Sequence, residues 1–273
     1  MRSYGMIILA LIAGISCKNV ASEDRNDENE VKAEGIVYEE YSGEEPTTPE
    51  ETELYQPVPP KVDPFENNGV PSDAEVLFNG SSFDQWMMVR DSSEVVWHLN
   101  EDGSMTVKDK TGDIRTKKNF GDVQLHLEWR SPAEVERDGQ NRANSGVFLQ
   151  GLYEVQILDN NDNDTYVNGQ VASIYKQHIP LAMASVPSGE WNSYDIIYRA
   201  PEFNEKGLKV KSATITVLHN GVLVQDHVEI KGTTPYIGWP KNVAHGKGPI
   251  KLQDHGDNSR VSFRNIWVRE LQE

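Results

Sequence analysis

Apolar and polar side chains alternate through residues 144–159, which read NSGVFLQGLYEVQILD. Tyr153, Val155 and Ile157 occupy one set of alternate positions, and Glu154 and Gln156 occupy the other. A period of two is typical of a β-strand with one buried face, so Glu154 and Gln156 should point to the same side, roughly 6 to 7 Å apart. A carboxylate and an amide at that distance suit the binding of one sugar ring. They equally suit the solvated face of an antiparallel sheet.

Shorter stretches of the same kind recur along the chain, at residues 95–99, 104–107, 123–129, 191–198 and 214–218. Turn residues separate them: Asn100 to Gly103 predicts a hairpin, and Asn220-Gly221 favours the type I′ turn that joins two paired strands. No segment has a sustained 3.6-residue apolar period, apart from a short helical turn expected at residues 81–86. Many short strands without a long helix predict an all-β domain, an antiparallel β-sandwich (jelly roll), over residues 73–273.

A second segment, residues 248–267, repeats the pattern of the first. If Leu252 faces the core with Ile250, then Lys251, Gln253 and His255 share the opposite face. Asp254 is expected to hold the turn that follows, by accepting hydrogen bonds from backbone N–H groups. Because a lone histidine is more often structural than catalytic, His255 gains a functional role only if another part of the chain supplies a partner.

The first 16 residues have the order of a secretory signal peptide: Arg2, an apolar run from Met6 to Ile12, and small residues ahead of Cys17. The apolar run is too short to span a bilayer, which takes about 20 residues. Cys17 is the only cysteine, and its position resembles the lipidation site of bacterial lipoproteins. The segment predicts an exported protein, lipid-anchored at Cys17 to a bacterial membrane and facing the periplasm or the cell surface. A plain cleaved signal is the alternative.

Residues 17–72 lack apolar periodicity and are predicted to form a disordered, extended acidic linker. Residues 18–75 hold 4 Lys and Arg against 17 Asp and Glu, a net of −13 out of the −17 of the whole chain. The remaining domain is also net negative, which argues against nucleic acid as a partner.

Two loops offer further candidate ligands. The run from Asp159 to Asp164 is rich in the oxygen donors that Ca²⁺ prefers, although such clusters are also ordinary in turns. Residues 165–180 bring Tyr175, Lys176 and His178 together in the sequence. That composition suits a loop that lines a sugar site, or one that simply caps the sandwich.

A series of short motifs between residues 74 and 271 resembles, in order, the 3-keto-disaccharide hydrolase family. They are Leu77-Phe78-Asn79-Gly80 with Trp86, Asn144-Ser145-Gly146, Tyr153-Glu154-Val155-Gln156, Ser173-Ile174-Tyr175, Glu190-Trp191-Asn192, His219-Asn220-Gly221-Val222, Leu252-Gln253-Asp254-His255-Gly256 and Arg264-Asn265-Ile266-Trp267. The resemblance implies a concanavalin-like lectin/glucanase sandwich whose concave sheet carries a carbohydrate site. It also implies an exported bacterial protein that acts on glycosides already oxidised at C3. The sequence departs from the family at Val171-Ala172-Ser173, where a Gly-Ala pair is common, and this departure bears on the shape of the loop.

An ordinary glycosidase uses two carboxyl groups, about 5 Å apart when it retains the anomeric configuration and about 6.5 to 9.5 Å apart when it inverts it. Glu154 has no second acid on its own strand face, because the Gln156 amide cannot transfer protons; Glu128 is the acid that another strand could supply. A ketone at C3 removes the need for two acids, because it acidifies the C2 proton. One base can then form an enolate that expels the C1 substituent, and the resulting glycal is hydrated to the 3-keto sugar.

On this chemistry, Glu154 and His255 are the expected proton-transfer groups, in an order that the sequence does not assign. The expected sugar-binding or enolate-stabilising neighbours are Asn144, Gln156, Tyr175, Lys176 and Gln253. A divalent cation held by Glu154 and His255 would do similar work. Trp191 suits the core as well as a sugar platform. The competing hypothesis is a non-catalytic carbohydrate-binding surface module, since sandwich folds host both functions.

Overall fold

The computed structural model describes residues 45–64, 66–134 and 136–271, and the chain divides into two units, Met1–Pro59 and Pro60–Glu273. The described part of the first unit has one short 3-10 helix, η1 (Pro49–Thr52), with no buried residue. The expected signal peptide, Cys17 and the first part of the expected linker lie outside the described residues, so export and lipidation stay predictions. No helix in the described ranges is both long and apolar enough to cross a membrane.

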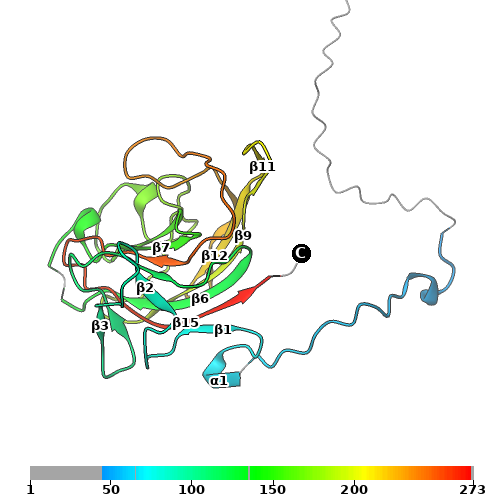
Figure 1. Ribbon diagram of the computed structural model, residues 1–273, viewed down its shortest axis with the longest axis horizontal. Helices are drawn as coiled ribbons and strands as arrows, with labels where there is room; N and C mark the ends of the chain where they lie inside the picture. Colours follow the sequence, from blue (N-terminus) through cyan, green and yellow to red (C-terminus); the bar gives the residue numbers. More distant parts are fainter. Residues whose placement is uncertain (1–44, 65, 135, 272–273) are drawn as a thin grey trace, which may run out of the picture. The chain divides into compact units, whose positions relative to one another are not determined.

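The second unit is built from two antiparallel sheets (Figure 1). The larger sheet has eight strands in the order β13-β12-β9-β6-β15-β4-β3, and β1 also pairs with β15. Its strands are β1 (Glu75–Phe78), β3 (His98–Leu99), β4 (Met105–Thr106), β6 (Val123–Arg130), β9 (Asn192–Arg199), β12 (Ala213–His219), β13 (Val222–Ile230) and β15 (Ser262–Glu270).

The smaller sheet has five strands in the order β2-β5-β14-β7-β8. They are β2 (Trp86–Met88), β5 (Ile114–Thr116), β14 (Lys251–Leu252), β7 (Ser145–Leu149) and β8 (Tyr153–Ile157). A separate hairpin joins β10 (Glu202–Phe203) to β11 (Lys209–Lys211). The remaining elements of this unit are the short helices α1 (Glu66–Gly69), η2 (Gly139–Asn141) and η3 (Val167–Gly169).

The two sheets enclose a hydrophobic core to which both contribute alternate residues. Leu125 and Leu127 of β6 and Val155 of β8 are fully buried in it, as the period-two pattern predicts. Two tyrosines of β9 also bond across the core: the Tyr194 hydroxyl donates to the backbone carbonyl of Gln156 (2.8 Å), and the Tyr198 hydroxyl donates to the side chain of Gln150 (2.7 Å). The first bond ties β8 to the larger sheet, and the second ties the turn between β7 and β8 to it.

The predicted fold class, an all-β antiparallel sandwich, is confirmed. The hairpin expected at residues 100–103 joins β3 to β4, and Asn220-Gly221 joins β12 to β13 with φ angles of 52° and 77°, the positive values that a type I′ turn requires. The helical turn expected at residues 81–86 is wrong. There the Trp86 N–H bonds to the Phe83 carbonyl (2.8 Å) in a tight turn that leads directly into β2.

Candidate active site

A row of three side chains crosses the outer face of the five-stranded sheet, opposite the core. The strand register places Lys251 of β14 beside Phe148 of β7, and Phe148 beside Glu154 of β8. The Lys251 ammonium lies 3.5 Å from the centre of the Phe148 ring and pairs with the carboxylate of Asp113 (2.7 Å). A charged pair and an aromatic ring thus lie next to the Glu154 carboxyl.

A second row runs parallel to the first, from Gln253 through Gly146 to Gln156. The Gln253 N–H donates to the Gly146 carbonyl (3.1 Å), and Gly146 is paired with Gln156 in the register of β7 and β8. Glu154 and Gln156 therefore share a face, as the alternation predicts. Because Gly146 has no side chain, the Glu154 carboxyl group and the Phe148 ring occupy the space above the middle of this row.

Two loops cover this face, so β7 and β8 are buried on both sides. The segment after η3 pairs with the free edge of β8: the Tyr175 N–H donates to the Glu154 carbonyl (3.1 Å), and the Gln156 N–H donates to the Ser173 carbonyl (3.0 Å). The loop after β13 reaches the other end of β8, where the Thr234 hydroxyl accepts from the Glu154 N–H (3.2 Å). The interpretation of this face as an ordinary solvated surface is therefore wrong.

Between the sheet and these loops lies a cavity of about 230 Å³. It brings together parts of the chain that are more than a hundred residues apart in sequence. Its lining residues are Asn144, Phe148, Glu154, Gln156, Tyr175, Thr234, Tyr236, Gln253 and His255. Six of these nine are among the seven sugar-site residues expected from the sequence, and the seventh, Lys176, contacts the wall from outside.

Glu154 is the acidic group of the cavity lining and is only 5% exposed. Burial raises the pKa of Glu154 to about 8; the Lys251 charge opposes this shift, and the Asp113 charge adds to it. Among the described residues, no side chain or backbone N–H is hydrogen-bonded to the Glu154 carboxyl oxygens. A carboxyl group in this setting is largely protonated at neutral pH, so it can donate a proton to a bound molecule.

Amide side chains form the polar floor of the cavity. The Gln156 amide nitrogen donates to the side-chain oxygens of Gln140 (3.2 Å) and Asn144 (3.3 Å), which fixes the orientation of the group. The amide oxygens of Gln156 and Gln253 are both buried, and neither has a hydrogen-bond partner. A buried acceptor without a donor is costly, and two such acceptors facing one cavity match the hydroxyl donors of a sugar.

His255 lines the cavity from the turn after β14, with 34% of its side chain exposed. Its Nδ1 lies 2.9 Å from the Asp257 carboxylate. A carboxylate only accepts hydrogen bonds, so Nδ1 carries a proton, and whenever the ring is neutral its lone pair is on Nε2. Asp254 holds the turn as expected, since its carboxylate accepts from the N–H groups of Gly256 (3.0 Å) and Gly112 (2.8 Å).

Lys176 lies just outside the lining and connects its two loops. Its ammonium donates to the Tyr236 carbonyl (2.6 Å) and lies 4.6 to 5.5 Å from the ring centres of Tyr166, Tyr175 and Tyr236. The Tyr166 and Tyr175 hydroxyls share a hydrogen bond of 2.7 Å. Burial, then this bond, raises the pKa of Tyr175 above its ordinary value, so its phenol stays protonated.

Several residues singled out from the sequence lie elsewhere. Glu128 does not supply a second acid, because it lies on the outer face of the other sheet and pairs with Arg264 (2.6 Å). Trp191 is neither core nor sugar platform: its ring packs between the guanidinium groups of Arg130 (4.5 Å) and Arg264 (4.1 Å). His178 bonds the backbone carbonyl of Glu229 (2.7 Å) and does not line the cavity.

The site also contains residues that the sequence analysis missed. Phe148 was recognisable, because it alternates with buried positions of β7 and so faces the same way as Glu154. Thr234 and Tyr236 come from a loop without alternation, and their place over β8 depends on tertiary contacts. Asp257 lies two residues after His255, a spacing that a turn brings within hydrogen-bonding distance.

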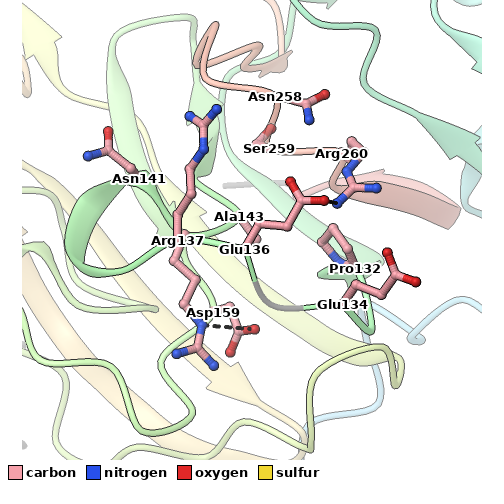
Figure 2. Close-up of a pocket in the computed structure, with 11 residues that line it drawn as sticks. Pro132, Glu134, Glu136, Arg137, Asn141, Ala143, Asp159, Asn258, Ser259 and Arg260 are labelled. Atoms are coloured by element: carbon pink, nitrogen blue, oxygen red, sulfur yellow. Dashed lines mark ion pairs between the residues drawn. The ribbon is translucent and has the colours of Figure 1, made fainter.

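The run from Asp159 to Asp164 borders a different, small polar cavity, shown in Figure 2. The Asp159 carboxylate already accepts from the Asn161 N–H (3.1 Å) and the Ser188 hydroxyl (2.6 Å), and it lies 3.4 Å from Nε of Arg142. The oxygens of the Asp159 carboxylate are therefore already bound by other groups of the protein. Within the described residues, no group of three or more His, Cys, Asp or Glu side chains is placed to hold a metal ion.

Comparison with known proteins agrees with this geometry. The family model described as "3-keto-alpha-glucoside-1,2-lyase-like domain" matches residues 73–269. Three crystal structures from Parabacteroides distasonis ATCC 8503, all provisionally described as glycosyl hydrolases, are similar to the chain. The first is 52% identical, with a TM-score of 0.78, over 82% of this chain and 97% of that one.

The other two structures are more distant. One is 25% identical, with a TM-score of 0.51, over 72% of this chain and 99% of that one. The other is 20% identical, with a TM-score of 0.52, over 73% and 94% of the two chains, and shows the fold alone. No match was found among curated proteins.

The family match and the similar glycosyl hydrolase structures indicate a carbohydrate-active protein, built as a β-sandwich with its cavity on the outer face of the smaller sheet. The family match covers most of the chain. The chain belongs to the 3-keto-alpha-glucoside-1,2-lyase-like family, the family whose motifs its sequence resembles.

Proposed function

We propose that this protein is an enzyme that cleaves glycosides already oxidised to a ketone at C3, by elimination across C1 and C2 followed by hydration. The observation that supports it is the meeting of Glu154 and His255 in the lining of one cavity. The family description, which names a 3-keto-alpha-glucoside 1,2-lyase, supports the same chemistry.

His255 is the base in this mechanism. With Nδ1 bonded to Asp257 (2.9 Å), its Nε2 accepts the C2 proton, which the neighbouring ketone makes acidic. Histidine is suited to this step because its ordinary pKa lies near neutrality. The electron pair of the broken C2–H bond forms the C2–C3 double bond, and the C3 oxygen becomes an enolate.

Glu154 is the general acid that protonates the leaving group. As the enolate collapses, C1–C2 becomes a double bond, the C1–O bond breaks, and the departing oxygen takes the proton of the Glu154 carboxyl. The pKa of about 8 keeps that proton in place at neutral pH. Addition of water across C1=C2 then puts a hydroxyl on C1 and a proton on C2, which gives the free 3-keto sugar.

Hydrogen-bond donors in the lining stabilise the enolate oxygen. The Gln253 amide nitrogen is hydrogen-bonded to no described residue and can donate to this oxygen. The protonated Tyr175 phenol can donate to it by turning its O–H away from the Tyr166 hydroxyl. Preorganised donors of this kind contribute more in a closed cavity than in water. A divalent cation, if bound, would take Glu154, His255 and the two unpaired amide oxygens as ligands and would polarise the same oxygen.

The test offers the full-length chain a disaccharide and the same disaccharide oxidised at C3, and follows release of the 3-keto sugar. Cleavage of only the oxidised form, with a transient glycal, is the expected result. Equal cleavage of both forms would contradict elimination. Binding of the sugar without any turnover would instead support the carbohydrate-binding module.

The proposed enzyme acts outside the cytoplasm, anchored by lipid at Cys17. This part rests on the order of charged, apolar and small residues in positions 1–17. The measurement is partitioning of the protein, expressed in a Gram-negative host, into the detergent phase. Partitioning should be lost in Cys17→Ala; if it persists in that variant, the anchor proposal is wrong.

A further inference from the structure

The loop after β13 forms one wall of the cavity and is closed at its base. The Thr233 N–H donates to the Lys241 carbonyl (3.0 Å), and the Lys241 N–H donates back to the Thr233 hydroxyl (3.2 Å). The Thr234 hydroxyl donates to the carbonyl of Leu152 (3.1 Å), the residue directly before β8. Residues 233–241, the rim loop, are thus held at a fixed position beside the cavity; the segment between β13 and β14 that contains them runs orange in Figure 1.

The tip of the rim loop exposes large apolar side chains. Tyr236 lines the cavity, and among the residues that follow it in the sequence Ile237 is 83% and Trp239 is 87% exposed. Exposed aromatic and aliphatic side chains gathered on one loop mark a binding surface more often than an ordinary one. Pro235 and Pro240 flank the tip and limit the backbone freedom at its two ends.

The cavity is too small to enclose a whole disaccharide. Pockets for drug-sized ligands span roughly 300–1,000 Å³, whereas this one is about 230 Å³, which suits one sugar ring. The group attached through C1 must therefore lie outside the cavity, against its rim. Residues 233–240 contain no Asp, Glu, Lys or Arg. The nearby Lys176 ammonium already donates to the Tyr236 carbonyl (2.6 Å), so this part of the rim favours an uncharged group.

We propose that Trp239, with Ile237, forms a second subsite that binds the leaving group of the substrate, an uncharged sugar ring or a planar aglycone. The inference rests on the proposed function, because the ring in the cavity is taken to be the 3-keto sugar. The C–H face of a pyranose and the face of an aromatic aglycone both pack on an indole ring, and aromatic contacts add to the free energy gained by burial. The substrate is then a disaccharide or an aryl glycoside.

The experiment measures binding by titration calorimetry to the full-length chain carrying Glu154→Gln, which slows turnover by about 10² to 10⁴-fold. The probes are a 3-keto-disaccharide and the free 3-keto hexose. Trp239→Ala should weaken the disaccharide about fivefold to tenfold and leave the hexose unchanged, and Trp239→Phe should recover most of the loss. Leu99→Ala, in an exposed residue of β3 outside the cavity lining, is the control and should change neither value.

Three results would overturn the inference. The first is that Trp239→Ala changes neither affinity, or lowers both equally. The second is that Trp239→Ala leaves the disaccharide affinity intact but abolishes binding of the Cys17→Ala chain to vesicles of phosphatidylethanolamine and phosphatidylglycerol, which would make the tip a membrane contact. The third is that the free 3-keto hexose does not bind the chain at all, in which case the proposed function fails too. Either of the first two leaves the proposed function intact.

Discussion

Gly146 lies directly against the carboxyl group of Glu154, and no larger side chain fits there. A Cβ atom at position 146 would overlap Glu154 Oε1 and would lie 3.0 Å from its carboxyl carbon and 2.9 Å from the Phe148 ring. The φ angle of Gly146 is not in the left-handed region. The space that glycine leaves, rather than its backbone freedom, is therefore what the site requires.

Gly146→Ala should displace the Glu154 carboxyl and lower kcat/KM for a 3-keto glycoside at least tenfold. The extra methyl group is expected to lower the free energy of unfolding by about 1 to 3 kcal/mol, as overpacking of well-packed sites does. Gly246→Ala is the matched control, because a Cβ there meets nothing within 4 Å. Steady-state kinetics and urea unfolding of both variants check this prediction, and equal activity of the two would contradict it.

Glu154→Gln should lower kcat by about 10² to 10⁴-fold, since it removes the proton that the leaving group takes. In the wild type, kcat should fall as the pH rises through about 8, the pKa of Glu154. A pH–rate profile of the wild type checks this. A profile that stays flat between pH 7 and 9, measured with chemistry as the slow step, would argue against Glu154 as the acid.

The same variant should change the pH dependence of stability. The pKa of Glu154 is raised from 4.5 to about 8 on folding, so the stability that its protonated form provides is fully present below about 4.5 and is lost as the pH rises through about 8. The predicted quantity is the unfolding free energy of Glu154→Gln minus that of the wild type. This difference should be a few kcal/mol more positive at pH 9 than at pH 4, because each unit of pKa shift corresponds to about 1.4 kcal/mol. Chemical denaturation at both pH values measures this difference.

Asp257→Asn should lower kcat at least tenfold while leaving KM nearly unchanged. An amide in place of the carboxylate can donate to Nδ1 of His255, which stabilises the tautomer whose Nε2 carries a proton and cannot act as base. His255→Asn should lose about 10² to 10⁴-fold in kcat. If Asp257 only held the turn, its substitution would lower the melting temperature without lowering kcat of the folded protein.

Lys176→Met should raise KM several-fold with a smaller effect on kcat. The substitution removes the donor to the Tyr236 carbonyl and the charge among three tyrosine rings, so the rim loop loses its tie to the loop that carries Tyr175. Lys206→Met, in an exposed turn, is the control and should change neither constant. A KM equal to that of the wild type would mean that Lys176 does not position the wall.

Asp159→Ala should destabilise the domain by about 3 kcal/mol, because it leaves the mostly buried Arg142 guanidinium without its carboxylate partner and with only the Asp162 carbonyl as acceptor. Burial opposes the charged form of Asp159, but the hydrogen bonds from Ser188 and Asn161 and the Arg142 charge outweigh it and lower the pKa. The stability that this carboxylate provides is therefore present above the ordinary aspartate pKa and is lost at more acid pH. Thermal unfolding at pH 7 and pH 3 should show a larger difference between variant and wild type at pH 7.

The sequence predicted the strand elements of the site better than its loops. Alternation placed Glu154 and Gln156 on one face because a strand repeats every two residues regardless of its surroundings. It also placed Gln253 correctly, although β14 ends at Leu252 and the geometry there depends on a turn. The family resemblance, not the alternation, indicated that the two segments belong to one site.

The positions of the loops could not be predicted from the sequence, because they depend on hydrogen bonds between residues that are far apart in the chain. Tyr236 reaches the cavity through Thr234, which bonds the start of β8 from 80 residues away, and no local pattern encodes such a contact. Glu128 illustrates the reverse error. The strand that contains Glu128 was predicted correctly. Alternation does not say to which of the two sheets a strand belongs, so the sequence could not predict how far Glu128 lies from Glu154.

The cross-strand rows of the site have a consequence for how the protein acquires its activity. If β8 paired with β7 in a register shifted by one residue, Val155 would face the cavity in place of Glu154. The Glu154 carboxyl group would then point into the apolar core. Such a molecule would keep its strands but be chemically inert. Acquisition of activity therefore depends on β8 pairing with β7 in a single register, which the burial of Val155 and Ile157 favours and to which the hydrogen bond from the Tyr194 hydroxyl to the Gln156 carbonyl belongs.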